Sequence, residues 1–402
     1  MTTSTAPARQ ATRTPREPLF TPAFITLTVA DLAYFTAAGI ALLALPLYVT
    51  GPVGSNKAGA GIAFGAFAVT ALLLRPVAGR LTDTVGRRPL LAAGGILCAL
   101  CMVATAHVDA LGAVIAIRLV LGVAEAAFFV ASFAALADLA PPSRMGEALS
   151  YNSLGLYAGI TCGPLLGELL IRVGGFTAAW YGAGALAVLA TVAVFRMGET
   201  RRPRSADDGP AKLIHRKAVA PALGFLASVI AMAGFLSLAA LHAESIGLAA
   251  TGLPLAVYGM VVVVCRIAFA RVPDRFPPLA LGAASLVMIA FGLIVISVWT
   301  APIGAVVGAA TMAIGVTFST PAFFSAIFAT AKPSERGAAS GVASASLDVG
   351  LGGGPVVLGL VAESAGIPGA LAVGAGVALV GSAWTLHLSR QTAPRRPAPG
   401  TP

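Results

Sequence analysis

The sequence predicts an all-α membrane protein in which twelve transmembrane helices form two pseudo-symmetric six-helix bundles. Of its 402 residues, 57% are hydrophobic and only 10% are charged, whereas a soluble domain carries about 25% charged residues. Twelve apolar stretches each come close to the roughly 20 residues that a helix needs to cross a bilayer. Short motifs in the first half of the chain recur in the second half at a constant offset of 191 residues.

The expected spans divide six and six around a polar stretch. We expect a first bundle over 22–195, a cytoplasmic linker over 196–217 and a second bundle over 218–388. The polar ends, 1–21 and 389–402, are expected to be cytoplasmic tails, and both are expected to be disordered. The spans are expected at 24–49, 58–79, 90–107, 112–135, 148–171, 176–195, 218–241, 247–270, 278–299, 302–329, 339–362 and 367–388.

The internal repeat rests on three motifs with no insertion between them. They are RPVAGRLTD at 75–83 and RIAFARVPD at 266–274, PPSRMGEA at 141–148 and KPSERGAA at 332–339, and GITCGP at 159–164 and GLGGGP at 350–355. A chain that repeats a mostly apolar unit is typical of a transporter whose binding site lies between two related bundles.

The positive charges predict the topology. The net charge is +10, and seven lysines and arginines fall within 196–217. Most of the others lie in the tails or follow even-numbered spans, whereas the opposite ends of the spans carry only Lys57 and Arg172. By the positive-inside rule, both termini and the linker are expected in the cytoplasm of a multi-pass inner (plasma) membrane protein. A nucleic-acid-binding patch is the rival interpretation. The first apolar run is far longer than the ~7–15 apolar residues of a signal peptide, so no cleaved leader is expected.

The turn between the second and third spans, GRLTDTVGRR at 79–88, resembles the signature loop of the major facilitator superfamily. That resemblance implies a charge network that locks the two bundles on the cytoplasmic side. Gly79 would let two helices approach and Gly86 would make a tight turn. Asp83 would hold an arginine from a neighbouring helix. Arg87 and Arg88 complete the motif. The rival interpretation is a solvated run of topogenic charge.

The second copy of this loop keeps Asp274 and Arg275 but has Ala270 and Phe276 where the first has glycines. A weaker gate is therefore expected there.

Charged residues within the fourth span are candidates for proton coupling. Arg118 and Glu125 lie in an apolar helix, where such side chains are costly and face a cavity or a partner. R-x-x-x-G at 118–122 resembles the superfamily motif whose arginine is tied to proton transfer. Seven residues separate Arg118 from Glu125, which places them on one helix face about 10 Å apart. Asp31 in the first span is expected as their partner, closer in depth to Glu125. A purely structural ion pair is the alternative.

The fifth span resembles the superfamily motif of exporters that run as antiporters. Its glycines recur every four residues and form a groove for another helix, and its proline kinks the helix. Glu168 replaces the last glycine of the motif, and plain helix packing is the alternative interpretation. The motif residues are Gly155, Gly159, Gly163, Pro164 and Gly167. The equivalent stretch in the eleventh span is preceded by Asp348, a further candidate proton or cation site.

Aromatic and polar residues within spans are candidates to line a substrate cavity, with lipid contact or packing as the alternative for each. Rings and acids suit a bulky, amphipathic or cationic ligand. The candidates are Tyr34, Phe128, Phe129, Tyr151, Asn152, Tyr157, Phe323 and Phe324.

Several chemistries are not indicated. The sequence has no Walker-type phosphate loop, Ser/His/Asp constellation or zinc motif. Cys98-x-x-Cys101 lies in an apolar helix without a second pair, so packing is the favoured interpretation. No cofactor, metal or nucleic acid is expected, and an enzyme is not expected. The expected partners are a small-molecule substrate, protons and the bilayer, for a monomer.

The resemblance covers about 22–388 and implies a drug:H⁺ antiporter-like exporter with the major facilitator fold. The alternatives are a proton-coupled importer of sugars or metabolites and, in another class, a channel or scaffold.

Overall fold

The protein is described by a computed structural model that covers residues 18–141, 145–200, 216–269, 272–273, 275–331 and 336–392. Asp274, most of the two expected tails and most of the expected linker lie outside these residues. The described part of the chain contains helices and connections but no strand. Its ten helical elements are α1 (Pro22–Thr50), α2 (Lys57–Thr84), α3 (Arg87–Thr105), α4 (Leu111–Leu139), α5 (Met145–Arg196), α6 (Arg216–Ser245), α7 (Leu253–Ala268), α8 (Pro278–Val298), α9 (Pro302–Ala329) and α10 (Arg336–Thr392).

Two of these elements are each a pair of helices joined by a tight break. In α5 the backbone leaves helical geometry at Gly174 and at Gly175, where φ is 69°. In α10 it does so at Gly366, where φ is 74°. Glycine adopts positive φ without the steric cost that a Cβ imposes. Gly175 and Gly366 are themselves 191 residues apart, so the repeat extends to the backbone. The breaks fall between the spans expected at 148–171 and 176–195, and between those at 339–362 and 367–388.

The helices have the length and composition of membrane spans. Within the described ranges, nine are long and apolar enough to cross a bilayer when α5 and α10 are each counted once. The helix α7 is shorter, at 16 residues. The expected span 247–270 was therefore too long, because turns occupy the chain before Leu253 and the helix ends at Ala268.

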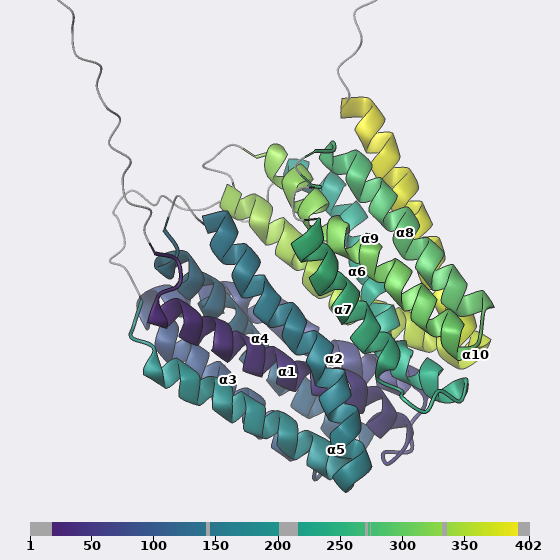
Figure 1. Ribbon diagram of the computed structural model, residues 1–402, viewed down its shortest axis with the longest axis horizontal. Helices are drawn as coiled ribbons and strands as arrows, with labels where there is room; N and C mark the ends of the chain where they lie inside the picture. The colour runs from purple at the N-terminus through teal and green to yellow at the C-terminus, as the bar shows by residue number, and fades with distance from the viewer. Residues whose placement is uncertain are drawn as a thin grey trace, which may run out of the picture.

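The helices gather into two groups. Figure 1 shows α1 to α5 in purple to teal on one side and α6 to α10 in teal-green to yellow on the other. Within the groups, α1 packs on α5 and α6 packs on α10, and across them α2 packs on α10 and α5 packs on α7. We call the side where α1 begins and α10 ends the termini side. The opposite side, which carries the α1–α2 turn at 51–56 and the break at Gly366, is the far side.

Small residues let the two groups approach closely along α2 and α10. A Cβ added to Gly61 would collide with the carbonyl group of Pro355, and one added to Gly65 would collide with that of Gly352. Nearer the far side, the backbone N–H of Lys57 donates to Glu363 Oε2 at 3.1 Å. The two helices therefore meet backbone to backbone, as glycine-rich membrane helices do.

Candidate functional site

An ion pair joins the two groups of helices inside the span region. Arg75 of α2 reaches Asp348 of α10 with Nε 2.5 Å from Oδ2 and Nη2 2.7 Å from Oδ1. The two side chains are 19% and 2% exposed. This bidentate geometry uses the planar fork of the guanidinium and is the strongest form of arginine–carboxylate contact. Asp348, expected as a proton or cation site, thus has a partner from the other group.

Sequence reasoning quoted Arg75 only as part of the repeat and did not propose it as a site residue. Two signals could have found it: it lies inside the apolar span 58–79, and it recurs as Arg266 at the repeat offset. A charged side chain within a span is a functional candidate by default. The Arg75 guanidinium also lies over the ring of Phe129 in α4, 4.7 Å from the ring centroid. Within the first group of helices, Arg75 therefore has a cation–π contact that does not depend on Asp348.

Glu125 of α4 lies within electrostatic range of three other charged groups. They are Arg75, Arg118 and Asp348. The guanidinium of Arg118 donates to backbone carbonyls of α2, from Nε to Ala63 at 3.2 Å and from Nη2 to Phe64 at 3.3 Å. The site thus contains two carboxyl groups and two guanidinium groups, contributed by α2, α4 and α10. Because the charges of the two carboxylates and two guanidinium groups balance, a carboxyl group here can gain or lose a proton while each arginine keeps an acceptor, so that no buried charge is left unpaired.

Asp31 does not pair with Glu125, contrary to expectation. Its carboxylate accepts hydrogen bonds from Ser132 Oγ, at 2.8 Å to each oxygen, and from Asn152 Nδ2 at 2.7 Å. The error came from helix length, because α4 runs to Leu139 rather than 135. Counted from that end at 1.5 Å per residue, Glu125 lies about 21 Å deep and Ser132 about 10 Å deep, close to the level of Asp31.

Aromatic rings line α1 and α4 next to this charge cluster. Tyr34 stacks on Phe128 with centroids 3.8 Å apart and planes 7° apart, and both side chains are fully buried. Phe35 meets Phe129 edge to face. The Tyr34 hydroxyl is buried and lies beside Glu125 and Cys98. A buried hydroxyl beside a carboxyl group is a place where a water molecule or a substrate group can bind.

The other expected cavity residues are spread over the molecule. Asn152 is the buried partner of Asp31. Tyr151 is 40% exposed and lies against Phe20. Phe323 packs within the second group against Gly224 and Gly282, and Phe324 lies against Phe225. For Phe323 the structure shows packing, the alternative interpretation.

Tyr157 takes part in a second contact between the groups. Arg266 of α7 donates from Nη2 to the Tyr157 hydroxyl at 2.7 Å, and its Cζ lies 4.2 Å from the centroid of that ring.

The glycines of the expected antiporter motif face α1. A Cβ at Gly159 would lie 2.7 Å from the Thr36 nitrogen, and one at Gly163 would lie 2.5 Å from the Cα of Gly39. Gly155 and Gly167 lie similarly against Thr28 and Ile40, and Pro164 follows within the same helix. Glu168, which departs from the motif, accepts from Arg172 at 2.6 Å and from the Gly252 N–H at 2.9 Å. This residue therefore links α5 to the start of α7.

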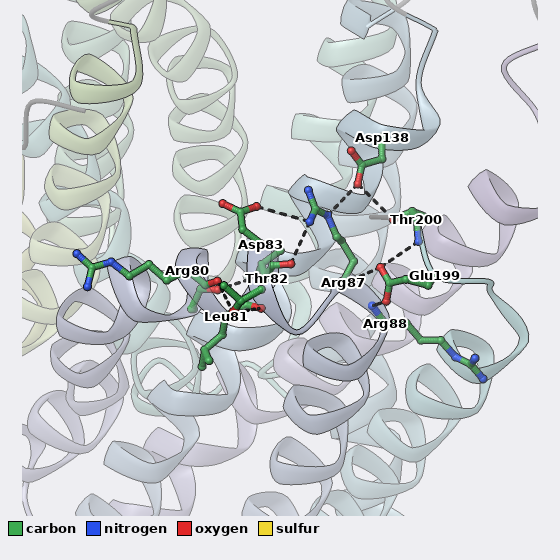
Figure 2. Close-up of polar contacts among 11 residues, drawn as sticks. Arg80, Leu81, Thr82, Asp83, Arg87, Arg88, Asp138, Glu199 and Thr200 are labelled. Atoms are coloured by element: carbon green, nitrogen blue, oxygen red, sulfur yellow. Dashed lines mark hydrogen bonds and ion pairs between the residues drawn. The ribbon is translucent and has the colours of Figure 1, made fainter. Parts of the chain in front are cut away.

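The charged loop between α2 and α3 is held within the first group of helices (Figure 2). Arg87 Nε lies 2.8 Å from Asp138 Oδ2 at the end of α4, and Arg87 Nη1 lies 3.5 Å from Asp83 Oδ1. Glu199 accepts from the N–H groups of Arg87 and Arg88 and so caps α3. The resemblance implied that this loop locks the two groups together, but the contacts drawn in Figure 2 lie within the first group. The two groups instead meet between α2 and α10 and between α5 and α7.

The remaining gate residues are placed as follows. A Cβ at Gly79 would meet no atom within 4 Å, so this glycine makes no close helix contact here. Gly86 has φ of 123° and forms the expected tight turn. Arg275 is exposed, and Asp274 lies outside the described residues. Sequence reasoning did not single out Asp138 or Glu199, because their contacts with Arg87 and Arg88 are distant in sequence.

A groove of about 390 Å³ opens between α2 and α10 beside the ion pair. Its walls are apolar, and Asp348 is its ionisable lining residue. Other lining residues, such as Leu73 and Val349, are 69% and 46% exposed on the outer face of the helices. The surface that faces lipid is thus hollowed next to a carboxylate.

Comparison with known proteins identifies the family. The sequence model of the Major Facilitator Superfamily matches residues 27–350. An uncharacterised MFS-type transporter of Salmonella typhimurium is 28% identical over 378 residues, which cover 91% of this chain and 96% of that protein. The multi-drug resistance efflux pump PmrA of Streptococcus pneumoniae is 30% identical over 164 residues, 40% of this chain and 41% of that protein.

The fold comparison agrees. The inward-facing, occupied crystal structure of a bacterial homologue of the human lysosomal transporter Spinster has a TM-score of 0.77 at 15% identity, covering 94% of this chain and 98% of that one. At this identity the likeness shows the fold alone. Because the superfamily's sequence model matches well over half of it, this chain belongs to the Major Facilitator Superfamily, and it is a multi-pass membrane transporter rather than an enzyme.

Proposed function

We propose that this transporter exports a small amphipathic compound, a drug or natural product, in exchange for protons. The observation that carries the proposal is the cluster of Arg75, Arg118, Glu125 and Asp348, which puts two carboxyl groups between the bundles within the span region. Asp31 adds a third buried carboxylate in the first bundle. Acids within a membrane that face a cavity or a bundle interface are typical of proton pathways.

Export is favoured over import by two further observations. The glycine motif of α5, which resembles that of antiporters, packs along α1, the helix that carries Asp31. The relative PmrA is named a multi-drug resistance efflux pump, although it matches only 40% of this chain. The expected mechanism is alternating access, in which the bundles rock around a site near the bilayer midplane. The positive-inside rule places the termini side in the cytoplasm of the plasma membrane, and the transporter works as a monomer without a cofactor.

Transport in proteoliposomes of known orientation, with an imposed pH gradient, tests the proposal. Cationic dyes and lipophilic antibiotics serve as probes. We expect substrate to move against the proton flux in the wild type and the movement to fall in Asp31→Asn and Glu125→Gln. Asp109→Asn is the matched control, because Asp109 is an exposed acid on the far side. Movement with the proton flux would establish an importer instead, and flux that does not respond to the pH gradient would exclude proton coupling.

A further inference from the structure

The two repeats each send an arginine across to the other bundle. Arg75 of α2 contacts Asp348 of α10, and Arg266 of α7 contacts Tyr157 of α5. Both arginines and both acceptors are related by the repeat, since 75 + 191 is 266 and 157 + 191 is 348. The two contacts therefore occupy the same place in the pseudo-symmetric fold. Their acceptors differ, because one is a carboxylate and the other is a phenol.

We propose that Arg75 and Asp348 form the proton-operated latch of the transport cycle, and that Arg266 and Tyr157 form its proton-insensitive counterpart. This inference rests on the proposed proton coupling and names the positioning residue, Arg75, through which that coupling moves the bundles. An ionised Asp348 accepts two hydrogen bonds from Arg75 and holds α2 against α10. A neutral Asp348 keeps its shape but no longer attracts the guanidinium.

Release of the latch does not strand a bare cation. Breaking a buried ion pair is unfavourable when it leaves one charge uncompensated. Here Arg75 keeps the Phe129 ring and has Glu125, also on α4, within electrostatic range. The guanidinium can therefore pass from an acceptor in the other bundle to acceptors in its own bundle. The step is a proton transfer with no redox change: an O–H bond forms on Asp348 as a hydronium ion of the aqueous phase gives up its proton, and Arg75 changes partner.

Among the residues that the structure describes, the second contact has no recorded carboxylate to take over the arginine. Arg266 lies over the Tyr157 ring and donates to its hydroxyl, and the Arg266 Nε is buried without a hydrogen-bond partner. This contact pairs a guanidinium with a hydroxyl and a ring, and it contains no carboxylate that could take up a proton.

Few other ionisable groups lie close enough to Asp348 to account for a pH response at this contact. From α2 and α4 it faces Arg75 and Glu125. The helix α8 has no ionisable side chain. The ionisable residues of α6 lie near its ends, whereas α10 packs at this level on Val229 in its middle. They are Arg216, Lys217, His242 and Glu244.

The latch is observed in a state in which the bundles are packed together toward the far side, through the contacts of Gly61 and Gly65 with α10 and of Lys57 with Glu363. Neutralising Asp348 removes a stabilising contact from this state. Under the proposal it is therefore expected to favour the alternative state, in which the bundles separate on the far side.

Distances between spin labels, measured without substrate, test this proposal. In a background lacking the four native cysteines, labels at Ala110 and Thr300 report the far side and labels at Val85 and Phe276 report the termini side; all four positions are exposed. We expect lowering the pH to increase the long-distance population at the far side in the wild type. Asp348→Asn should show that population at all pH values and lose the response.

Two repeat-matched variants separate a latch from a merely structural contact. Tyr157→Phe removes the equivalent hydrogen bond and is expected to shift the resting distances but keep the pH response. Tyr157→Asp gives the second contact a carboxylate and is expected to enlarge the response. Asp348→Glu and Arg75→Lys keep both charges and should retain it, which guards against a variant that simply fails to fold.

The outcomes distinguish this inference from the proposed function. A wild-type response in Asp348→Asn, or its loss in Tyr157→Phe, would overturn the latch. Loss in Glu125→Gln with retention in Asp348→Asn would move the proton site to Glu125 and leave antiport intact. A pH response at Asp348 in a protein that transports nothing against protons would keep the latch and reject the proposed exporter.

Discussion

The loop between α2 and α3 and the loop between α7 and α8 are related by the internal repeat, but their structures differ. In the first, α2 runs to Thr84, turns at Gly86 and enters α3 at Arg87. In the second, the helix ends at Ala268, the equivalent of Val77, which is seven residues earlier. The first loop carries a charge network, whereas Arg275 in the second is exposed.

One difference in sequence explains much of this difference in helix length. The second repeat has Pro273 at the position where the first repeat has Thr82. Thr82 donates its hydroxyl to the Ala78 carbonyl within a continuing helix. A proline at that position lacks the N–H and clashes with the carbonyl four residues earlier, so the helix ends before it. The comparison teaches that repeat symmetry sets where a helix lies, while local chemistry sets where it ends.

Importing the proline into the first loop should have the largest effect. Thr82→Pro is expected to end α2 near Ala78 and to destabilise the protein by about 3 kcal/mol. The melting temperature in detergent measures this, with Thr82→Ala as the control. That control loses one hydrogen bond and about 1 kcal/mol. Equal melting temperatures for the two variants would show that the proline does not cause the difference between the loops.

The pair of Arg87 and Asp138 is expected to come next. The side chains are 11% and 13% exposed, so the pair is largely shielded from water. Arg87→Gln and Asp138→Asn should each cost about 2 kcal/mol. The double variant should cost clearly less than the sum, because both changes remove one interaction. Strict additivity in thermal unfolding would mean that the two residues do not act as a pair.

The turn at Gly86 and the open site at Gly79 should respond with opposite signs. Gly86→Ala forces a Cβ into a backbone region with φ of 123° and against Glu199, at a cost of about 1 to 2 kcal/mol. Gly79→Ala adds a methyl group that meets nothing within 4 Å of a helical site, and it should stabilise by about 0.5 to 1 kcal/mol. Destabilisation by Gly79→Ala would show that the helix is closely approached there after all.

Asp83 should contribute least to stability. Its carboxylate lies 3.5 Å from Arg87 and its side chain is 55% exposed. Asp83→Asn is therefore expected to change stability by less than about 0.5 kcal/mol, and by less still at high salt. A large effect on transport with this small effect on melting would indicate that Asp83 acts in another state of the cycle.

Most of the fold could be predicted from sequence because it depends on composition and periodicity. The all-α class, the membrane location and the family are confirmed. Errors came at helix ends, where length is set by local residues: α4 ends at Leu139 rather than 135, and α7 begins at Leu253 rather than 247.

The site was harder to predict because it depends on rotation about helix axes and on contacts distant in sequence. Glu125 and Asp348 were chosen as intramembrane acids, but Arg75 was not, although its place inside an apolar span was a signal; which acid it contacts could not be read from spacing. The four-residue error at the end of α4 shifted the level of Glu125 by about one helical turn. That shift paired Asp31 with the wrong residue, when Ser132 and Asn152 are its partners.

The glycine contacts between α2 and α10 have a mechanical consequence. Side chains that interlock resist sliding, because each must leave its pocket before the next position is reached. Gly61 and Gly65 present backbone without side chains to Pro355 and Gly352, so the two helices do not interlock there. Rotation of one bundle against the other then requires few changes of side-chain rotamer at this surface. The energy barrier to such a rotation comes chiefly from the few polar contacts between the bundles.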